Sequence, residues 1–328
     1  MTTLLIALVP ALGMAFVEGP ASPPPSVVVV VGAPGQPEFA SEFQNWSKHW
    51  KDAAAKGGAD CLVIGAADEA SKPDHDRLHE AIEARAGESA EPLWIVLIGH
   101  GTFDGREAKF NLRGPDVTAT ELAAWLAPAK RPIVLLDCSS ASGPFLSKLS
   151  APNRIVVTAT RSGDEQNFAR FGQFVSEAIA DPAADLDKDG QVSVLEAFLT
   201  GSTRLAEFYK TKARLATEHP LLDDNGDRQG TPPDWFHGVR VTRRAKTGAA
   251  ADGLRAHQIH LVPSDREKAL PAAVRLQRDQ LELQLAALRD RKEELGEDDY
   301  YKALEPLLLQ LARLYKQAGL TESATPSR

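Results

Sequence analysis

The sequence predicts an α/β protein whose doubly wound, mainly parallel sheet is flanked by helices. Five short runs rich in Val, Ile and Leu lack apolar–polar alternation, as expected for parallel strands buried on both faces. Segments of helix length separate most of these runs, so strand and helix alternate and the crossovers should be right-handed. Two of the runs lead directly into His100 and Cys138. Ligands of open α/β sheets bind at such strand ends.

Composition places the chain among ordinary globular proteins. Its 328 residues are 43% hydrophobic and 25% charged, enough for one large domain or two. The net charge of −8, without a basic stripe interleaved with aromatics, argues against nucleic-acid binding. The only two cysteines are Cys61 and Cys138, so the chain is not a disulfide framework, although one bridge between them remains an alternative.

Residues 1–25 read as a signal-like segment and a Pro-rich linker. The apolar run over residues 4–16 is too short to span a bilayer comfortably, and small residues at Ala15 or Ala21 suit a cleavage site. No Lys or Arg precedes the run. We expect an exported protein, periplasmic or extracellular, with no stable membrane span once the signal is removed.

The α/β domain is predicted over residues 26–245. Its strands are expected at 26–32, 61–65, 93–99, 132–137 and 154–159. Helices are expected at 38–56, 75–86, 118–126, 144–149 and 167–180.

His100 and Cys138 follow strands that a helix-sized segment separates, so the two strands should be parallel neighbours whose carboxyl ends lie side by side. A Cys and a His brought together there form the minimum set for a thiol nucleophile with an acid/base partner.

These residues resemble the legumain/caspase-like group of cysteine peptidases, in its bacterial legumain-like branch. The resemblance is carried by the His100–Gly101 and Asp137–Cys138–Ser139 elements, and by residues 157–165 and 217–227, within a span of roughly 26–243. It implies a caspase-like fold and an endopeptidase acting on protein or peptide substrates. Cys138 would attack as thiolate, His100 would protonate the leaving amine, and the backbone N–H groups of Gly101 and Cys138 would hold the oxyanion.

Two departures from the family pattern keep a second interpretation open. Asp137 stands directly before Cys138, where a small residue is usual, and the Ser-Gly that should follow soon comes only at residues 142–143. A catalytically inactive relative, serving as a calcium-binding scaffold or interaction module, is therefore the alternative.

The loop after the fifth strand should shape a substrate pocket. Asp164 or Glu165 could accept a basic side chain, and Arg161 an acidic one, whereas the legumain resemblance suggests Asn. The cleavage specificity stays open.

Residues 185–196 match the EF-hand calcium loop at every defined position. Carboxylates at positions one, three and five converge on the ion, the glycine at six permits the turn, position seven offers its carbonyl, position nine acts through water, and the last glutamate can be bidentate. The predicted ligands of this structural Ca²⁺ are Asp185, Asp187, Asp189, Gln191, Ser193 and Glu196.

A second acidic turn is ambiguous. Asp223, Asn225 and Asp227 alternate as oxygen ligands would, but no glutamate follows at the right distance. The turn is either half of a calcium site or an Asx-rich turn.

The remaining chain changes character. Residues 246–264 read as a linker and 319–328 as a disordered tail. Between them, at 265–318, leucines and tyrosines recur at helical spacing on both sides of Gly296, which predicts an antiparallel helical hairpin. Its apolar seam could pack on the domain, on a second copy or on a partner.

Overall fold

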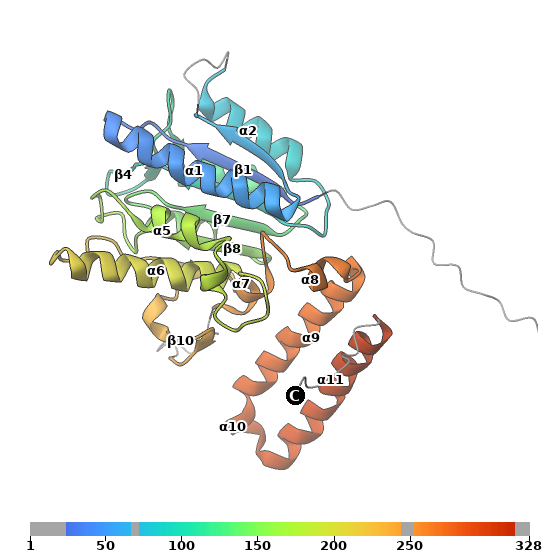
Figure 1. Ribbon diagram of the computed structural model, residues 1–328. Helices are drawn as coiled ribbons and strands as arrows, with labels where there is room; N and C mark the ends of the chain where they lie inside the picture. The colour runs from blue at the N-terminus through green and yellow to red at the C-terminus, as the bar shows by residue number, and fades with distance from the viewer. Residues whose placement is uncertain (1–23, 67–71, 244–251, 319–328) are drawn as a thin grey trace, which may run out of the picture.

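A six-stranded sheet forms the centre of the molecule. The computed structural model describes residues 24–66, 72–243 and 252–318 (Figure 1). Its strand order is β2-β1-β3-β7-β8-β9, and the first five strands are parallel, whereas β9 is antiparallel to β8. The strands are β1 (Ser26–Val31), β2 (Asp60–Ile64), β3 (Leu93–Ile98), β7 (Ile133–Asp137), β8 (Arg154–Thr158) and β9 (Leu221–Asp223). The five predicted strands are confirmed, and the doubly wound α/β class with them.

Helices cover both faces of this sheet, and side-chain alternation within each strand supplies both cores. In β7, Val134 and Leu136 join the apolar cluster under one helical layer, whereas Ile133 and Leu135 join the cluster under the other. The first layer holds α1 (Pro37–Gly57), α5 (Phe171–Ala178) and α6 (Val194–Thr211); the second holds α2 (Asp74–Arg85), α3 (Ala119–Leu126) and α4 (Gly143–Leu149). Because both faces are buried, the strands need no polar alternation.

Helix α5 begins at Phe171, four residues later than the predicted start. The carboxylate of Glu218 accepts hydrogen bonds from the N–H groups of Arg170 and Phe171, each at 2.9 Å. This partner is far along the chain, so the local pattern could not reveal where the helix starts.

Several short elements were not predicted. The strands β4 (Gly101–Phe103), β5 (Ala108–Phe110) and β6 (Val117–Thr118) form an antiparallel sheet, and β10 (Phe236–His237) pairs with β11 (Arg240–Val241). Two 3₁₀ turns, η1 (Pro182–Ala184) and η2 (Pro233–Trp235), complete this set. Strands of two or three residues are too short to carry a period that the sequence could display.

The predicted linker is wrong over residues 252–264, which pack against the α/β domain. Helix α7 (Leu254–Gln258) lies there, and Ala256 and Leu261 are 0% and 1% exposed within the first core cluster. A five-residue helix gives too short a periodic signal to be recognised before its partner surface is known. Residues 244–251 lie outside the described residues.

The C-terminal hairpin is confirmed. After α8 (Asp265–Ala269), α9 (Ala272–Asp290) and α11 (Glu297–Gln317) run antiparallel side by side, joined through α10 (Lys292–Leu295) (Figure 1). Gly296 has a φ of +74°, which suits the predicted turn. The signal-like segment and the tail over 319–328 lie outside the described residues. None of the helices in the described part combines the length and the apolar character that a membrane span requires.

Candidate functional site

The two strands that lead into His100 and Cys138 are neighbours, as predicted. β3 pairs with β7 in parallel, with Leu97 opposite Asp137, so both residues lie at the carboxyl edge of the sheet. The strand order reverses between β1 and β3, which makes this edge the switch point where such sheets bind ligands. The arrangement therefore brings the predicted pair to one place.

His100 is half-buried in an aromatic cage. Its ring centroid lies 5.0 Å from that of Phe39, 5.3 Å from Phe43 and 5.8 Å from Phe168. Nε2 lies 3.2 Å from the carbonyl oxygen of Pro34, in the loop after β1. Burial lowers the pKa of His100, although the Pro34 carbonyl acts in the opposite direction. The neutral imidazole is thus the favoured form.

Cys138 is sealed inside the molecule. Its side chain is 0% exposed and belongs to the core cluster between the sheet and α1. A Cβ atom at Gly172 would lie 2.8 Å from Cys138 Cβ and 2.8 Å from Trp46, which shows how closely α5 and α1 pack over the residue. Among the described residues, no hydrogen bond joins its sulfur to His100.

The Cys138 thiol is held in its neutral form. Burial raises its pKa well above the ordinary value, and the charges of Asp137 and Glu218 act in the same direction. A nucleophilic thiolate needs the opposite environment, with a cation, a helix N-terminus or open solvent beside it.

The predicted oxyanion donors are already engaged. Gly101 N–H donates to Ser140 Oγ at 3.1 Å, and Ser140 Oγ donates to the Gly101 carbonyl at 3.1 Å. Cys138 N–H donates to Leu97 O at 2.9 Å in the sheet. A developing oxyanion would find neither N–H group available without rearrangement.

Asp137 points to the opposite face from Cys138, as strand alternation requires. Its Oδ1 accepts hydrogen bonds from Ser139 N–H at 3.0 Å and Ser139 Oγ at 2.6 Å, whereas Oδ2 is buried without a hydrogen-bond partner among the described residues. Burial raises the pKa of Asp137 to about 6. Ser139 is 0% exposed.

The loop after β7 is closed by further hydroxyl contacts. Ser142 Oγ lies 3.1 Å from Thr160 Oγ1, which accepts Gly143 N–H at 2.9 Å. The structural roles of Ser140 and Thr160 were not predicted from the sequence, because their partners come from other strand ends. Together they hold residues 139–143 against the sheet.

Two of the three predicted pocket residues bind each other. Glu165 Oε1 lies 3.1 Å from Arg161 Nε and 2.5 Å from His219 Nδ1. Glu165 Oε2 accepts the N–H groups of Arg161 and His219. Asp164 is exposed. Glu165 is thus a structural link between two loops, and its charge is not free for a substrate.

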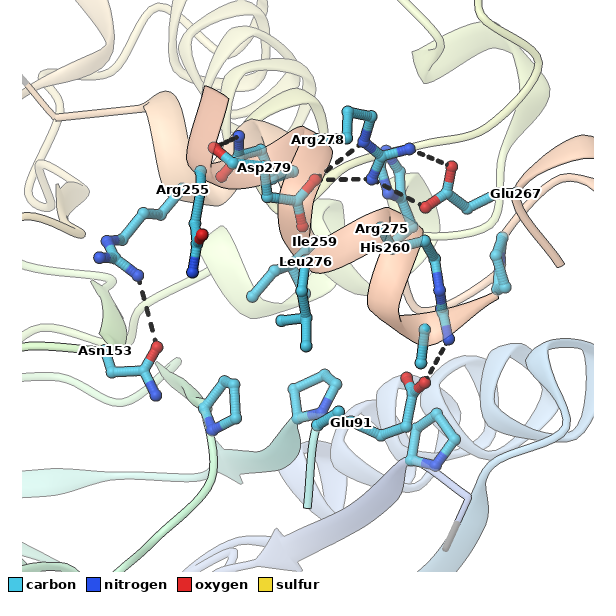
Figure 2. Close-up of a pocket in the computed structure, with 18 of the residues that line it drawn as sticks. Glu91, Asn153, Arg255, Ile259, His260, Glu267, Arg275, Leu276, Arg278 and Asp279 are labelled. Carbon is cyan, nitrogen blue, oxygen red and sulfur yellow. Dashed lines mark hydrogen bonds and ion pairs between the residues drawn. The ribbon is translucent and has the colours of Figure 1, made fainter. Parts of the chain in front are cut away.

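The two cavities differ greatly in size. The one near His100 measures about 10 Å³, beside Pro34 and Phe43, which is room for one water molecule. A cavity of about 340 Å³ lies at the opposite, amino edge of the sheet, between Pro92 and α9 (Figure 2). The larger cavity therefore lies at the edge of the sheet away from His100 and Cys138.

The predicted calcium loop has the form that such a site needs. One carboxylate oxygen from each of Asp185, Asp187 and Asp189 lies within 4.8 Å of the other two. Gly190, at position six, has a φ of +91°. Burial raises the pKa of Asp189, and the charges of Asp187 and Glu196 add to the effect. A divalent cation would relieve this crowding of negative charge.

The other predicted side-chain ligands, Ser193 and Glu196, bond to each other and to the loop backbone, and Glu196 is not part of the aspartate group. Glu196 Oε2 accepts Ser193 N–H and Oγ, both at 2.9 Å, and its Oε1 accepts Leu186 N–H at 2.7 Å. Ser193 and Glu196 form a capping box at the start of α6. The side-chain amide of Gln191 donates to Asp189. The backbone carbonyl of Gln191 is therefore the group that position seven of the loop would offer to an ion. The three aspartates and the Gln191 carbonyl are oxygen donors of the kind that calcium takes, whereas each Glu196 oxygen already accepts a hydrogen bond.

The second acidic turn is a buried hydrogen-bonded structure. Asp223 Oδ1 accepts Gly226 N–H at 2.9 Å, and Asn225 Oδ1 accepts Asp227 N–H at 2.8 Å, as in Asx turns. Beside it, Asp252 accepts Asp224 N–H and Thr231 Oγ1. Burial, reinforced by the charge of Asp224, raises the pKa of Asp252 to about 8. No local pattern in the sequence indicates that Asp252 belongs here, because its partners Asp224 and Thr231 lie more than 20 residues away.

Replacing Asp252 with Asn should reduce the pH dependence of stability between about pH 4 and 8. An aspartate in the unfolded chain titrates near pH 4, so the folded protein keeps a proton that the unfolded chain releases, and this contribution falls as the pH rises. Urea unfolding of parent and Asp252→Asn at pH 5 and pH 8 measures it. Between pH 5 and pH 8, the free energy of unfolding of the parent should fall by at least about 1.4 kcal/mol more than that of Asp252→Asn, the equivalent of one pKa unit. Equal losses would contradict the assignment.

Both cysteines are free, so the alternative Cys61–Cys138 disulfide is not formed.

Comparisons with known proteins give a likeness in fold alone. No protein-family model matches the sequence, and no curated protein matches it. The initiator caspase Dronc of Drosophila is similar in structure, with 15% identity and a TM-score of 0.42 over 62% of this chain and 81% of that chain. Caspase-1 from Spodoptera frugiperda has 10% identity and a TM-score of 0.40 over 61% of this chain and 85% of that chain.

Proposed function

We propose that this chain is a non-catalytic calcium-binding protein that uses a caspase-like α/β domain as a scaffold for protein partners. The observation that carries the proposal is the burial of Cys138, whose side chain is 0% exposed. A buried thiol with a raised pKa is neither accessible nor ionised. The N–H groups of Gly101 and Cys138 are also taken by Ser140 and Leu97.

Calcium is the ion we propose for residues 185–196. Three carboxylates, a glutamate and a carbonyl form an all-oxygen set of the kind that Ca²⁺ prefers. Because the loop lies between η1 and α6, the ion would brace the helical layer that covers Cys138. Its role in the proposal is structural.

The partner surface we propose is the C-terminal hairpin, through self-association or binding of another protein. Tyr301 is 52% exposed, and Leu308 and Leu309 are each 47% exposed, on its outer helix α11. The proposal keeps the exported location that the signal-like segment suggests.

A cysteine endopeptidase is the second candidate, favoured by one observation. The paired strands β3 and β7 bring His100 and Cys138 to the same edge, and Phe43 of the His100 cage shares the core cluster of Cys138. For this chemistry the loop after β7 would have to move and break the Ser140–Gly101 contacts.

Turnover of a pooled fluorogenic peptide library tests the choice. The library carries Asn, Asp, Arg or Lys at the cleaved position, and parent and Cys138→Ala are compared in millimolar calcium. We expect both proteins to give the same background signal. Cleavage by the parent alone would overturn the non-catalytic proposal and reveal the specificity.

A further inference from the structure

The calcium loop contacts the segment that leads to the C-terminal hairpin at three places. Asp187 Oδ2 accepts a hydrogen bond from His257 Nε2 at 3.0 Å. Gln191 Oε1 accepts Ser264 N–H at 3.0 Å. Val194 N–H donates to the Ile259 carbonyl at 2.9 Å. The loop and this distant segment therefore form one packed unit.

Two of these contacts act on proposed ligands, Asp187 through its carboxylate and Gln191 through its side chain. Asp187 Oδ1 accepts Asp189 N–H inside the loop, which leaves Oδ2 for His257. Both oxygens of Asp189 accept hydrogen bonds from Gln191, so Ser264 acts on Asp189 through the Gln191 side chain. Groups that hold metal-binding carboxylates from outside fix their orientation and raise the affinity for the ion.

The same segment also forms hydrogen bonds with α9. Gln258, which follows His257, donates from Nε2 to the Asp279 carbonyl at 3.0 Å and to Glu282 at 2.9 Å. Ser264 caps α8, and Glu267 of α8 pairs with Arg278 of α9 at 2.5 Å (Figure 2). Contacts thus run without a break from the calcium loop to the hairpin.

A second contact attaches α9 to the α/β domain without involving the calcium loop. Arg275 of α9 pairs with Glu91, next to β3, at 2.5 Å, across the large cavity (Figure 2). Within the described part of the chain, no hydrogen bond or ion pair joins Arg275 or Glu91 to residues 185–196, so this pair provides a matched control for any effect of calcium.

We propose that calcium in the 185–196 loop controls the docking of the C-terminal hairpin, with His257 and Gln191 as the positioning residues that couple the two. The inference rests on the calcium binding proposed above. An ion that orders the carboxylates of Asp187 and Asp189 also orders the groups to which α7 and α8 attach. By linkage, docking of the hairpin raises the affinity for calcium by the same factor.

Amide hydrogen exchange on the full chain tests the coupling. Calcium should slow exchange in α9 of the parent by about tenfold relative to chelator, within the usual range of coupling factors. In His257→Ala and in Gln191→Ala the slowing should be largely lost, and calorimetry should show about tenfold weaker calcium binding. His257→Gln, which keeps a donor, should restore part of both effects. Arg275→Ala should speed exchange equally with and without calcium.

The outcomes separate the inference from the proposal beneath it. If calorimetry finds no calcium binding by the parent, the proposed calcium function fails and the inference fails with it. If the parent binds calcium but exchange in α9 does not respond, the coupling alone is overturned. The coupling is also overturned if His257→Ala and Gln191→Ala both bind calcium with the parent's affinity and show the parent's slowing of exchange in α9.

Discussion

In the folded protein, Cys138 is expected to react with a thiol probe at least about 1,000-fold more slowly than in urea. The sulfur has no exposed surface, and burial raises the pKa of the thiol. Reaction therefore needs an opening of the core that lies between the sheet and α1. Such openings cost free energies up to that of global unfolding, about 5–15 kcal/mol, and about 4 kcal/mol already gives a factor of 1,000.

The measurement uses a Cys61→Ser background, so that Cys138 is the only thiol. In that background, His100→Ala should leave the labelling rate unchanged, because no hydrogen bond joins the two side chains in the described structure. Rapid labelling that His100→Ala abolishes would show an activated Cys138–His100 dyad. The cysteine endopeptidase would then be the favoured function.

Calcium at 100 times its dissociation constant is expected to stabilise the fold by about 2.7 kcal/mol, through binding linkage. For a chain of this size the melting temperature should rise by roughly 4 °C. Asp185→Asn should remove most of this rise, because Asp185 is buried and its two oxygens accept the N–H groups of Lys188 and Gly190 around the proposed ion.

Thermal melts in calcium and in chelator check this result. Asp298→Asn makes the same charge change on the exposed first turn of α11 and should melt like the parent in both solutions. A parent whose melting temperature is the same in calcium and in chelator would contradict the proposed site.

The central sheet followed from the sequence because its signal is local. Five unbroken apolar runs with helical segments between them allow few arrangements other than a parallel sheet covered on both faces. The edge strand β9 and the start of α5 were missed because long-range pairing decides them. Leu222 pairs with Val157, and Glu218 caps the backbone at Phe171.

The sequence also located the candidate sites. His100 and Cys138 do lie at adjoining strand ends, and Asp185, Asp187 and Asp189 do converge, because strand order and loop spacing fix backbone positions. The position of a side chain does not by itself decide whether that side chain is free to bind a substrate. Glu165 stands in the predicted pocket loop, yet its charge is used by Arg161 and His219.

By itself, the sequence determined the fold class, the edge of the sheet that His100 and Cys138 share, the convergence of the aspartates in residues 185–196 and the helical hairpin. These depend on periodicity and on fixed spacing within short segments. Only the tertiary structure decided that Cys138 is sealed and that Ser140 occupies Gly101 N–H. It likewise decided that His257 holds Asp187. Burial, pKa and the partner of a hydrogen bond depend on residues that are distant in the chain and meet only in the folded molecule.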